Sequence, residues 1–343
     1  MDEVWAELNR LNPWWQATSW RGNVVPRSWY LNALQKATKK DLIAVLIGMR
    51  RVGKTSLFLS HIEQLLALGV DARQIAYLSF SERLLAQTRI VEYVDIVRAR
   101  HKLDIVTPVY LFLDEVQEKE GWQDEVKYVY DLHQNIKLFV TGSSAVLLSQ
   151  KTSSLTGRFA KIEIFPLSFN EYLLFTKNKL SSTNLEHNRI LTDQYLNAGG
   201  VPDIVLGKKD KDDLRTTIES ILYRDITALY GIRNPAILKN LYELLADCTT
   251  TPVGTTNLEK TLGLAAETAI AYLQYLQDAY VLHALPLWSD SRKKTKSTNP
   301  KYYLCDLGVL DAFALHPRVG HLSETAVILH THRLMSHGTV KRI

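Results

Sequence analysis

The residues best suited to chemistry lie in one short run, Gly48-Met49-Arg50-Arg51-Val52-Gly53-Lys54-Thr55, which fits the phosphate-binding pattern G-x-x-x-x-G-K-[ST] without departure. A chain that wraps phosphate oxygens with its N–H groups needs glycine where a Cβ would clash, here at Gly48 and Gly53. Lys54 supplies positive charge to the outer phosphates, and Thr55 offers its hydroxyl to Mg²⁺. The run therefore predicts a nucleotide site, which we assign to Gly48, Arg50, Arg51, Val52, Gly53, Lys54, Thr55 and Ser56.

Two adjacent acids, Asp114 and Glu115, follow the apolar run 109–113, sixty residues beyond Lys54. An ion-dependent hydrolase needs one carboxylate in the Mg²⁺ shell and another that orients or deprotonates the attacking water. Both roles belong at the carboxyl edge of a parallel sheet. We therefore expect Asp114, with Thr55, to hold Mg²⁺ and Glu115 to act on the water.

Alternating strands and helices must position these residues. Apolar runs predict five strands, at 42–47, 75–80, 109–113, 137–140 and 160–165, and helical spacing separates them at 56–68, 90–101 and 124–132. This alternation predicts an α/β fold with a parallel sheet covered on both faces. The strand at 75–80, between the loop and the acids, is typical of additional-strand P-loop ATPases. No Asn/Thr-Lys-x-Asp guanine-reading motif follows the phosphate-binding run, which favours ATP, with Mg²⁺, over GTP.

Two further residues have competing interpretations. Ser143 follows the fourth strand, where its hydroxyl would face the γ-phosphate, or else cap the next helix. Arg158 lies just before the fifth strand. In a ring assembly it would reach a neighbouring subunit's γ-phosphate, but it is equally consistent with a surface or salt-bridged arginine.

The second half of the chain is mostly helical, with apolar spacing at 214–229, 236–248 and 265–277. Two short strands at 281–287 and 301–304 flank a basic loop, which predicts a winged helix-turn-helix. Sequence-independent DNA contact through this loop is one interpretation. Helix 265–277, which would lie in the DNA groove, contains no Lys or Arg. A winged helix with a purely structural role is therefore favoured over one that contacts DNA. The DNA interpretation rests on Arg292, Lys293, Lys294 and Lys296.

Charge and composition set the remaining limits. The formal net charge of +5 arises entirely in the last 61 residues, so the predicted ATPase part is neutral. His330 and His332 are more consistent with a polar tail than with a metal site. The chain has no apolar run near the ~18 residues of a membrane span, and only two cysteines. We expect a cytoplasmic protein without membrane contact.

Together these motifs resemble the bacterial and archaeal AAA-type ATPases that carry a C-terminal domain of unknown function. The resemblance runs over roughly 29–324. It rests on Ile-Gly-Met-Arg-Arg-Val-Gly-Lys-Thr at 47–55, Leu-Asp-Glu-Val-Gln at 113–117, Thr-Gly-Ser-Ser at 141–144, Leu-Thr-Gly-Arg at 155–158, Phe-Pro-Leu-Ser-Phe-Asn-Glu-Tyr at 165–172, Gly-Gly-Val-Pro at 199–202 and Tyr-Arg-Asp-Ile at 223–226.

The resemblance implies an AAA core, a winged-helix region and nucleotide-dependent switching, often in a ring. It also implies that Pro202, in a Gly-x-Pro turn, sits by the adenine. Many members continue into a nuclease-like domain with an acidic core. Because no such core is found after Glu324, nuclease activity is not expected.

These observations predict a Mg²⁺-dependent ATP-hydrolysing switch or motor that forms a homo-oligomer, with an unidentified protein as a further partner. The alternative is a DNA-binding regulator whose assembly ATP controls with little turnover. We expect an N-terminal helical segment at 1–40, the ATPase domain at 41–190, a helical winged-helix domain at 191–320 and a short basic tail at 321–343.

Overall fold

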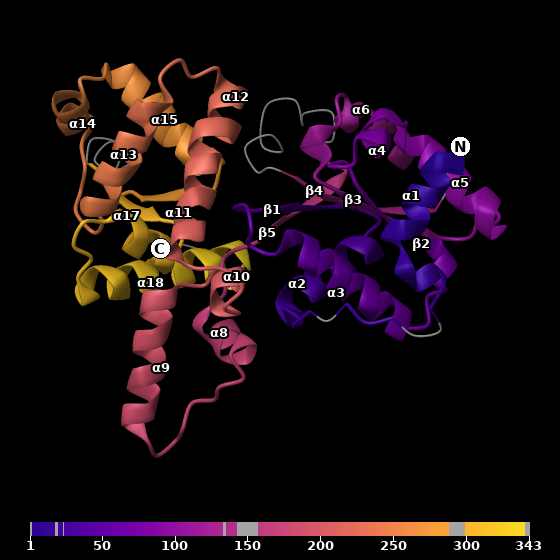
Figure 1. Cartoon of the computed structure of the whole chain (residues 1–343), viewed down its shortest axis with the longest axis horizontal. Helices are drawn as coiled ribbons and strands as arrows, with labels where there is room; N and C mark the ends of the chain where they lie inside the picture. The colour runs from indigo at the N-terminus through magenta and orange to yellow at the C-terminus, as the bar shows by residue number, and fades with distance from the viewer. Residues whose placement is uncertain are drawn as a thin grey trace. The chain divides into compact units, whose positions relative to one another are not determined.

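The computed structural model describes residues 2–17, 20–22, 24–132, 135–142, 157–287 and 299–339. The chain divides into two compact units (Figure 1). The first consists of Met1–Ile47 and Gly53–Ile164, and the second of Gly48–Val52 and Phe165–Ile343. The predicted domain boundary near 190 stays a prediction, whereas this division into compact units falls after Ile164. The reason is that the helices α8 (Phe169–Phe175) and α9 (Leu185–Ala198) pack with later helices of the chain.

The first unit is built on a five-stranded parallel sheet in the order β2-β3-β4-β1-β5. This sheet confirms the predicted α/β fold. The strand β4 lies between β1, which precedes the phosphate loop, and β3, which ends in the two acids. Every residue of β1 is buried, as expected of a central parallel strand covered on both faces. The strands are β1 (Ile43–Ile47), β2 (Ile75–Ser79), β3 (Val109–Asp114), β4 (Ile136–Thr141) and β5 (Phe159–Glu163).

Helices cover both faces of this sheet. In Figure 1, α2 and α3 lie on one side, and α5 and α6 on the other. Under α3, stacked Phe112 and Phe139 pack edge-on against Phe58. The helical elements are α1 (Asp2–Leu11), η1 (Pro13–Trp15), α2 (Ser28–Lys39), α3 (Lys54–Ala67), η2 (Ala72–Gln74), α4 (Arg83–Gln87), α5 (Ile90–His101), η3 (Val116–Glu118) and α6 (Trp122–Asp131).

In its described residues, the second unit consists mostly of helices and contains one antiparallel ribbon, β6 (Leu282–Leu285) with β7 (Lys301–Leu304). The helices α13 and α15 pack on this ribbon. The other elements are α10 (Pro202–Val205), α11 (Lys211–Ser220), the π-helix η5 (Ile221–Ile226), α12 (Thr227–Tyr230), α13 (Pro235–Asp247), α14 (Thr255–Leu262), α15 (Ala266–Asp278), α17 (Leu307–Phe313) and α18 (Val319–Ser336).

The C-terminal region contains a long helix and a basic segment. Much of the expected tail is the eighteen-residue helix α18, which packs against α9, α17 and β7. The basic residues Arg292, Lys293, Lys294 and Lys296 lie outside the described residues. Among the residues that are described, no helix is both long enough and apolar enough to cross a membrane.

Candidate functional site

The phosphate loop connects the buried strand β1 to helix α3, in the strand-loop-helix order that the sequence predicts. Gly48 and Gly53 have φ angles of 148° and 95°, which explains why both positions are glycine. Arg51 has φ 63°, an uncommon conformation for a residue with a Cβ and one that clusters at functional sites. The helix α3 begins at Lys54, and the first N–H groups of a helix are available to phosphate oxygens.

Arg50 and Val52, which we assigned to nucleotide binding, fall in the part of the loop that belongs to the second unit. Within that unit, one Arg50 nitrogen lies 3.2 Å from an Asp225 carboxylate oxygen, and another lies 3.4 Å from the Ser220 hydroxyl. Asp225 lies in the π-helix that follows α11, and insertions of this kind are frequent at functional sites. The Arg50 guanidinium therefore contacts protein groups, and its role toward a nucleotide stays a prediction.

Asp114 is the centre of a hydrogen-bonded cluster at the carboxyl end of β3. Only 2% of its surface is exposed. Its Oδ2 accepts hydrogen bonds from the Thr55 hydroxyl at 2.7 Å and the Tyr77 hydroxyl at 2.8 Å. Its Oδ1 accepts one from the Thr141 hydroxyl and one from the backbone N–H of Glu115 at 3.1 Å. The structure thus brings together Thr55 and Asp114, the two residues predicted to hold the metal.

This donor set suits a magnesium ion. Mg²⁺ prefers oxygen ligands, and the cluster offers a carboxylate and a hydroxyl within hydrogen-bond distance of each other. Hydroxyl and backbone donors orient the Asp114 carboxylate without adding a positive charge that would repel a cation. Thr55 and Asp114 would hold the ion, which would supply positive charge beside bound phosphates.

Glu115 follows directly, in a left-handed backbone conformation with φ 54°. Such a conformation is costly for a residue with a Cβ, by roughly 1–2 kcal/mol, and is a recurrent feature of active sites. The half-buried carboxylate accepts a hydrogen bond from the side-chain amide of Gln117. Glu115 is therefore held at the same sheet edge as Asp114, as the sequence predicts.

Tyr77 and Gln117 are contacts of the two acids that sequence reasoning did not identify. Burial and the nearby Asp114 charge raise the pKa of Tyr77 well above its ordinary value, so its hydroxyl stays protonated and remains a donor. A signal was present in the sequence. A tyrosine in a mostly apolar strand, Ile-Ala-Tyr-Leu-Ser, needs a partner for its hydroxyl once it is buried.

The remaining predicted residues are distributed more widely. Ser143 lies outside the described residues. Lys54 is buried in the first turn of α3, while Thr55 and Ser56 are more exposed. Arg158 pairs with Asp131, at the end of α6, at 3.0 Å. Pro202 is the first residue of α10 in the second unit.

The C-terminal histidines differ in exposure, since His316 is exposed whereas His330 and His332 are half-buried. In the described part of the chain, no three or more His, Cys, Asp or Glu side chains are grouped so that they could hold a metal ion. The rings of His283 and His332 lie 5.1 Å apart, and burial lowers the pKa of both.

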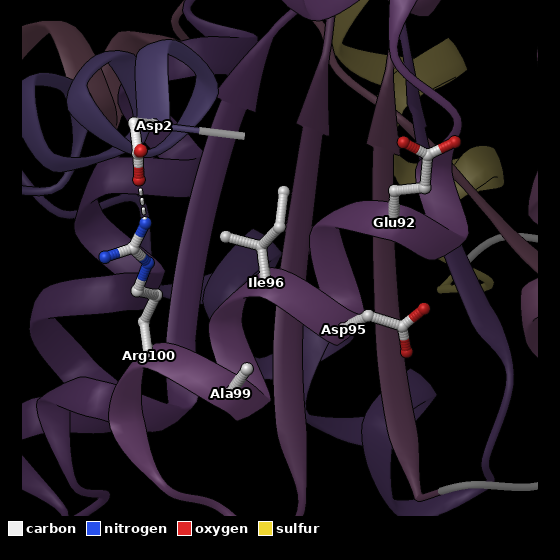
Figure 2. Close-up of a pocket in the computed structure, with 6 residues that line it drawn as sticks. All are labelled: Asp2, Glu92, Asp95, Ile96, Ala99 and Arg100. Atoms are coloured by element: carbon white, nitrogen blue, oxygen red, sulfur yellow. Dashed lines mark hydrogen bonds and ion pairs between the residues drawn. The ribbon is translucent and has the colours of Figure 1, made fainter.

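A separate cavity of about 420 Å³ lies along α5 and contains none of the predicted nucleotide residues. Figure 2 shows its lining, with the Arg100–Asp2 ion pair at one side and Glu92 and Asp95 at the other. This cavity is lined by Asp2, Glu92, Asp95, Ile96, Ala99 and Arg100.

Comparisons with known proteins find matches for both halves of the chain. Residues 40–173 match a family described as an AAA domain, and residues 189–318 match a domain of unknown function, DUF8612. An uncharacterized protein of Haemophilus influenzae is 29% identical over 83% of this chain and 72% of its own length. An uncharacterized protein of Methanocaldococcus jannaschii is also 29% identical, over 85% of this chain and 66% of its own length.

A solved structure extends the comparison to the fold. The Walker-type ATPase of Pyrococcus abyssi aligns with a TM-score of 0.53 and 14% identity, covering 85% of this chain and 97% of that one. At this identity the likeness concerns the fold alone. The chain thus matches an AAA domain followed by a domain of unknown function, and its fold is similar to that of a Walker-type ATPase.

Proposed function

We propose that the protein binds ATP with Mg²⁺ and hydrolyses it, and that the nucleotide state acts as a switch. The observation that carries the proposal is the 2.7 Å hydrogen bond between Thr55, in the phosphate-binding helix, and Asp114, at the end of β3. It joins two residues 59 positions apart in the sequence into one candidate magnesium site. The AAA-domain match and the P-loop fold support the same interpretation.

Each residue has a distinct role in this proposal. Lys54 binds the phosphates through its positive charge. The first turn of α3 binds them through its free backbone N–H groups. Thr55 and Asp114 hold Mg²⁺. Glu115 orients the attacking water and accepts its proton, a role that general-base catalysis assigns to a positioned carboxylate. The ribbon β6–β7 with α13, α14 and α15 is the winged-helix part that responds to the nucleotide.

The test is phosphate release by purified Lys54→Ala and Glu115→Gln variants. We expect Glu115→Gln to lower the rate about 10²- to 10⁴-fold while retaining ATP binding, because it removes the base but not the phosphate contacts. Lys54→Ala should weaken ATP binding itself. Glu120→Gln, at an exposed position five residues after Glu115, is the matched control and should leave the rate unchanged. Undiminished phosphate release in both site variants contradicts the catalytic proposal.

A further inference from the structure

Tyr77 reaches the candidate metal site from the edge of the sheet. It lies on β2, the strand that ends the sheet on one side, and its hydroxyl donates to Asp114 Oδ2 at 2.8 Å. The same oxygen accepts from the Thr55 hydroxyl at 2.7 Å. The position of Tyr77 therefore affects the carboxylate oxygen that also contacts the phosphate-binding helix.

The backbone of Tyr77 is in turn held by the N-terminal segment. The Tyr77 N–H donates to Asn12 Oδ1 at 2.6 Å, and the Asn12 side-chain amide donates back to the Tyr77 carbonyl at 2.9 Å. The same amide also donates to the Leu8 carbonyl at 2.7 Å. Asn12 is fully buried. Its side-chain amide pairs with the N–H and the carbonyl of Tyr77, as the backbone of a neighbouring strand would.

Two tryptophans extend this contact along β2. The indole N–H groups of Trp14 and Trp15 both donate to the carbonyl of Ile75, at 3.0 and 2.8 Å. Side chains thus satisfy backbone groups that an edge strand would otherwise present to water or to another chain. The tryptophan-rich N-terminus consequently determines where β2, and with it Tyr77, lies.

We propose that Tyr77 is a positioning residue for the magnesium-binding carboxylate. The Tyr77 hydroxyl orients Asp114 toward Thr55. The two hydrogen bonds between the Asn12 side chain and the Tyr77 backbone, here called the Asn12 clamp, keep the Tyr77 ring in place. This inference rests on the proposed ATPase function. Hydrogen bonds that orient a metal-binding side chain typically change metal affinity or activity 10- to 100-fold when they are removed. Tyr77 does not touch the ion or the nucleotide in this proposal, so its effect passes through Asp114.

The experiment compares Tyr77→Phe with the wild-type protein. The variant retains the ring and the Asn12 clamp but loses the hydroxyl. With the ATP analogue AMPPCP, we expect Mn²⁺ binding measured by electron paramagnetic resonance to weaken about 10-fold. The Mg²⁺ concentration for half-maximal phosphate release should rise by a similar factor, while AMPPCP binding in EDTA stays unchanged. Tyr110→Phe, on β3 four residues before Asp114, is the control and should leave both ion titrations unchanged.

Each result has a defined meaning. Unaltered Mn²⁺ and Mg²⁺ titrations in Tyr77→Phe overturn the positioning role. So does a lower unfolding temperature with the ion dependence unchanged, because that result assigns Tyr77 to packing alone. If the wild-type protein binds Mn²⁺ with AMPPCP but releases no phosphate, hydrolysis fails as a function while the Mn²⁺ comparison still tests Tyr77.

Discussion

His61 is a buried residue of α3, and its side chain lies among the aromatic residues of the core. It is 1% exposed, and its ring meets Phe112 and Phe139 edge-on. Its Nδ1 bonds to Gln64 Oε1 at 3.0 Å, whereas its buried Nε2 has no hydrogen-bond partner in the described part of the chain. Burial lowers the pKa of His61 to about 4. The ring is therefore neutral in the folded protein at neutral pH.

This residue predicts a loss of stability in acid. Between its unfolded pKa of 6.5 and its folded pKa of about 4, the unfolded chain binds the proton more readily, so stability falls as the pH drops through that window. Each pKa unit corresponds to about 1.4 kcal/mol, so the full effect is about 3 kcal/mol. Between pH 7 and pH 4, the free energy of unfolding should therefore fall by up to about 3 kcal/mol more in the wild type than in His61→Leu.

Urea denaturation at several pH values measures this difference. His316→Leu is the control. Because His316 is exposed, we expect this substitution to leave the loss of stability in acid unchanged. If His61→Leu and the wild type lose the same stability on acidification, His61 does not titrate as its burial predicts.

At the scale of elements, the Gly199–Gly200 turn joins α9 to α10 with no room for a side chain. A Cβ on Gly199 would lie 2.2 Å from Asp306 Oδ1, and one on Gly200 would lie 2.4 Å from the backbone oxygen of Leu167. The backbone of Gly200 is also hydrogen-bonded on both sides. Its N–H donates to the Asp306 carboxylate at 2.7 Å, and its carbonyl accepts from the Leu167 N–H at 2.6 Å. The turn thus has a packing role, and the adenine contact of Pro202 stays a prediction.

Gly200→Ala tests this close packing. We expect it to destabilise the second unit by about 2–3 kcal/mol, because the added methyl group meets backbone atoms that cannot rotate away. Gly320→Ala in α18 is a matched control, since nothing lies within 4 Å of its Cβ position and alanine favours a helix. Thermal unfolding followed by circular dichroism distinguishes the two variants. Equal unfolding temperatures would show that the turn adjusts without cost.

At the scale of the whole molecule, Arg158 bears on assembly. Its ion pair with Asp131 is about one-third exposed on both sides, and such surface pairs contribute only about 0–1 kcal/mol. Opening this pair would therefore cost little. Arg158 remains a candidate for stabilising phosphate charge in a neighbouring subunit, provided that the protein assembles.

We expect light scattering with AMPPCP and Mg²⁺ to show an oligomer. In that assembly Arg158→Ala should lower phosphate release at least 10-fold without changing the mass, because arginines that act across subunits stabilise the transition state. Asp131→Ala frees Arg158 and should preserve turnover. A strict monomer that hydrolyses ATP removes Arg158 from the mechanism.

Short-range patterns were sufficient to locate the phosphate loop, its flanking strand and helix, and the pair Asp114–Glu115. The reason is that these features depend on residues adjacent in the chain: glycine dihedral angles, a buried strand and the start of a helix. The α/β fold followed from the alternation of strands and helices for the same reason.

The partners of these residues depended on the tertiary structure. Tyr77 meets Asp114 because β2 pairs with β3 in a register that places Ser79 beside Asp114. Asn12 meets Tyr77 across 65 residues of chain. The unpartnered nitrogen of His61 and the narrow Gly199–Gly200 turn likewise follow from packing between segments far apart in sequence. Burial and contact distance arise only when such segments meet, so local spacing in one sequence does not encode them.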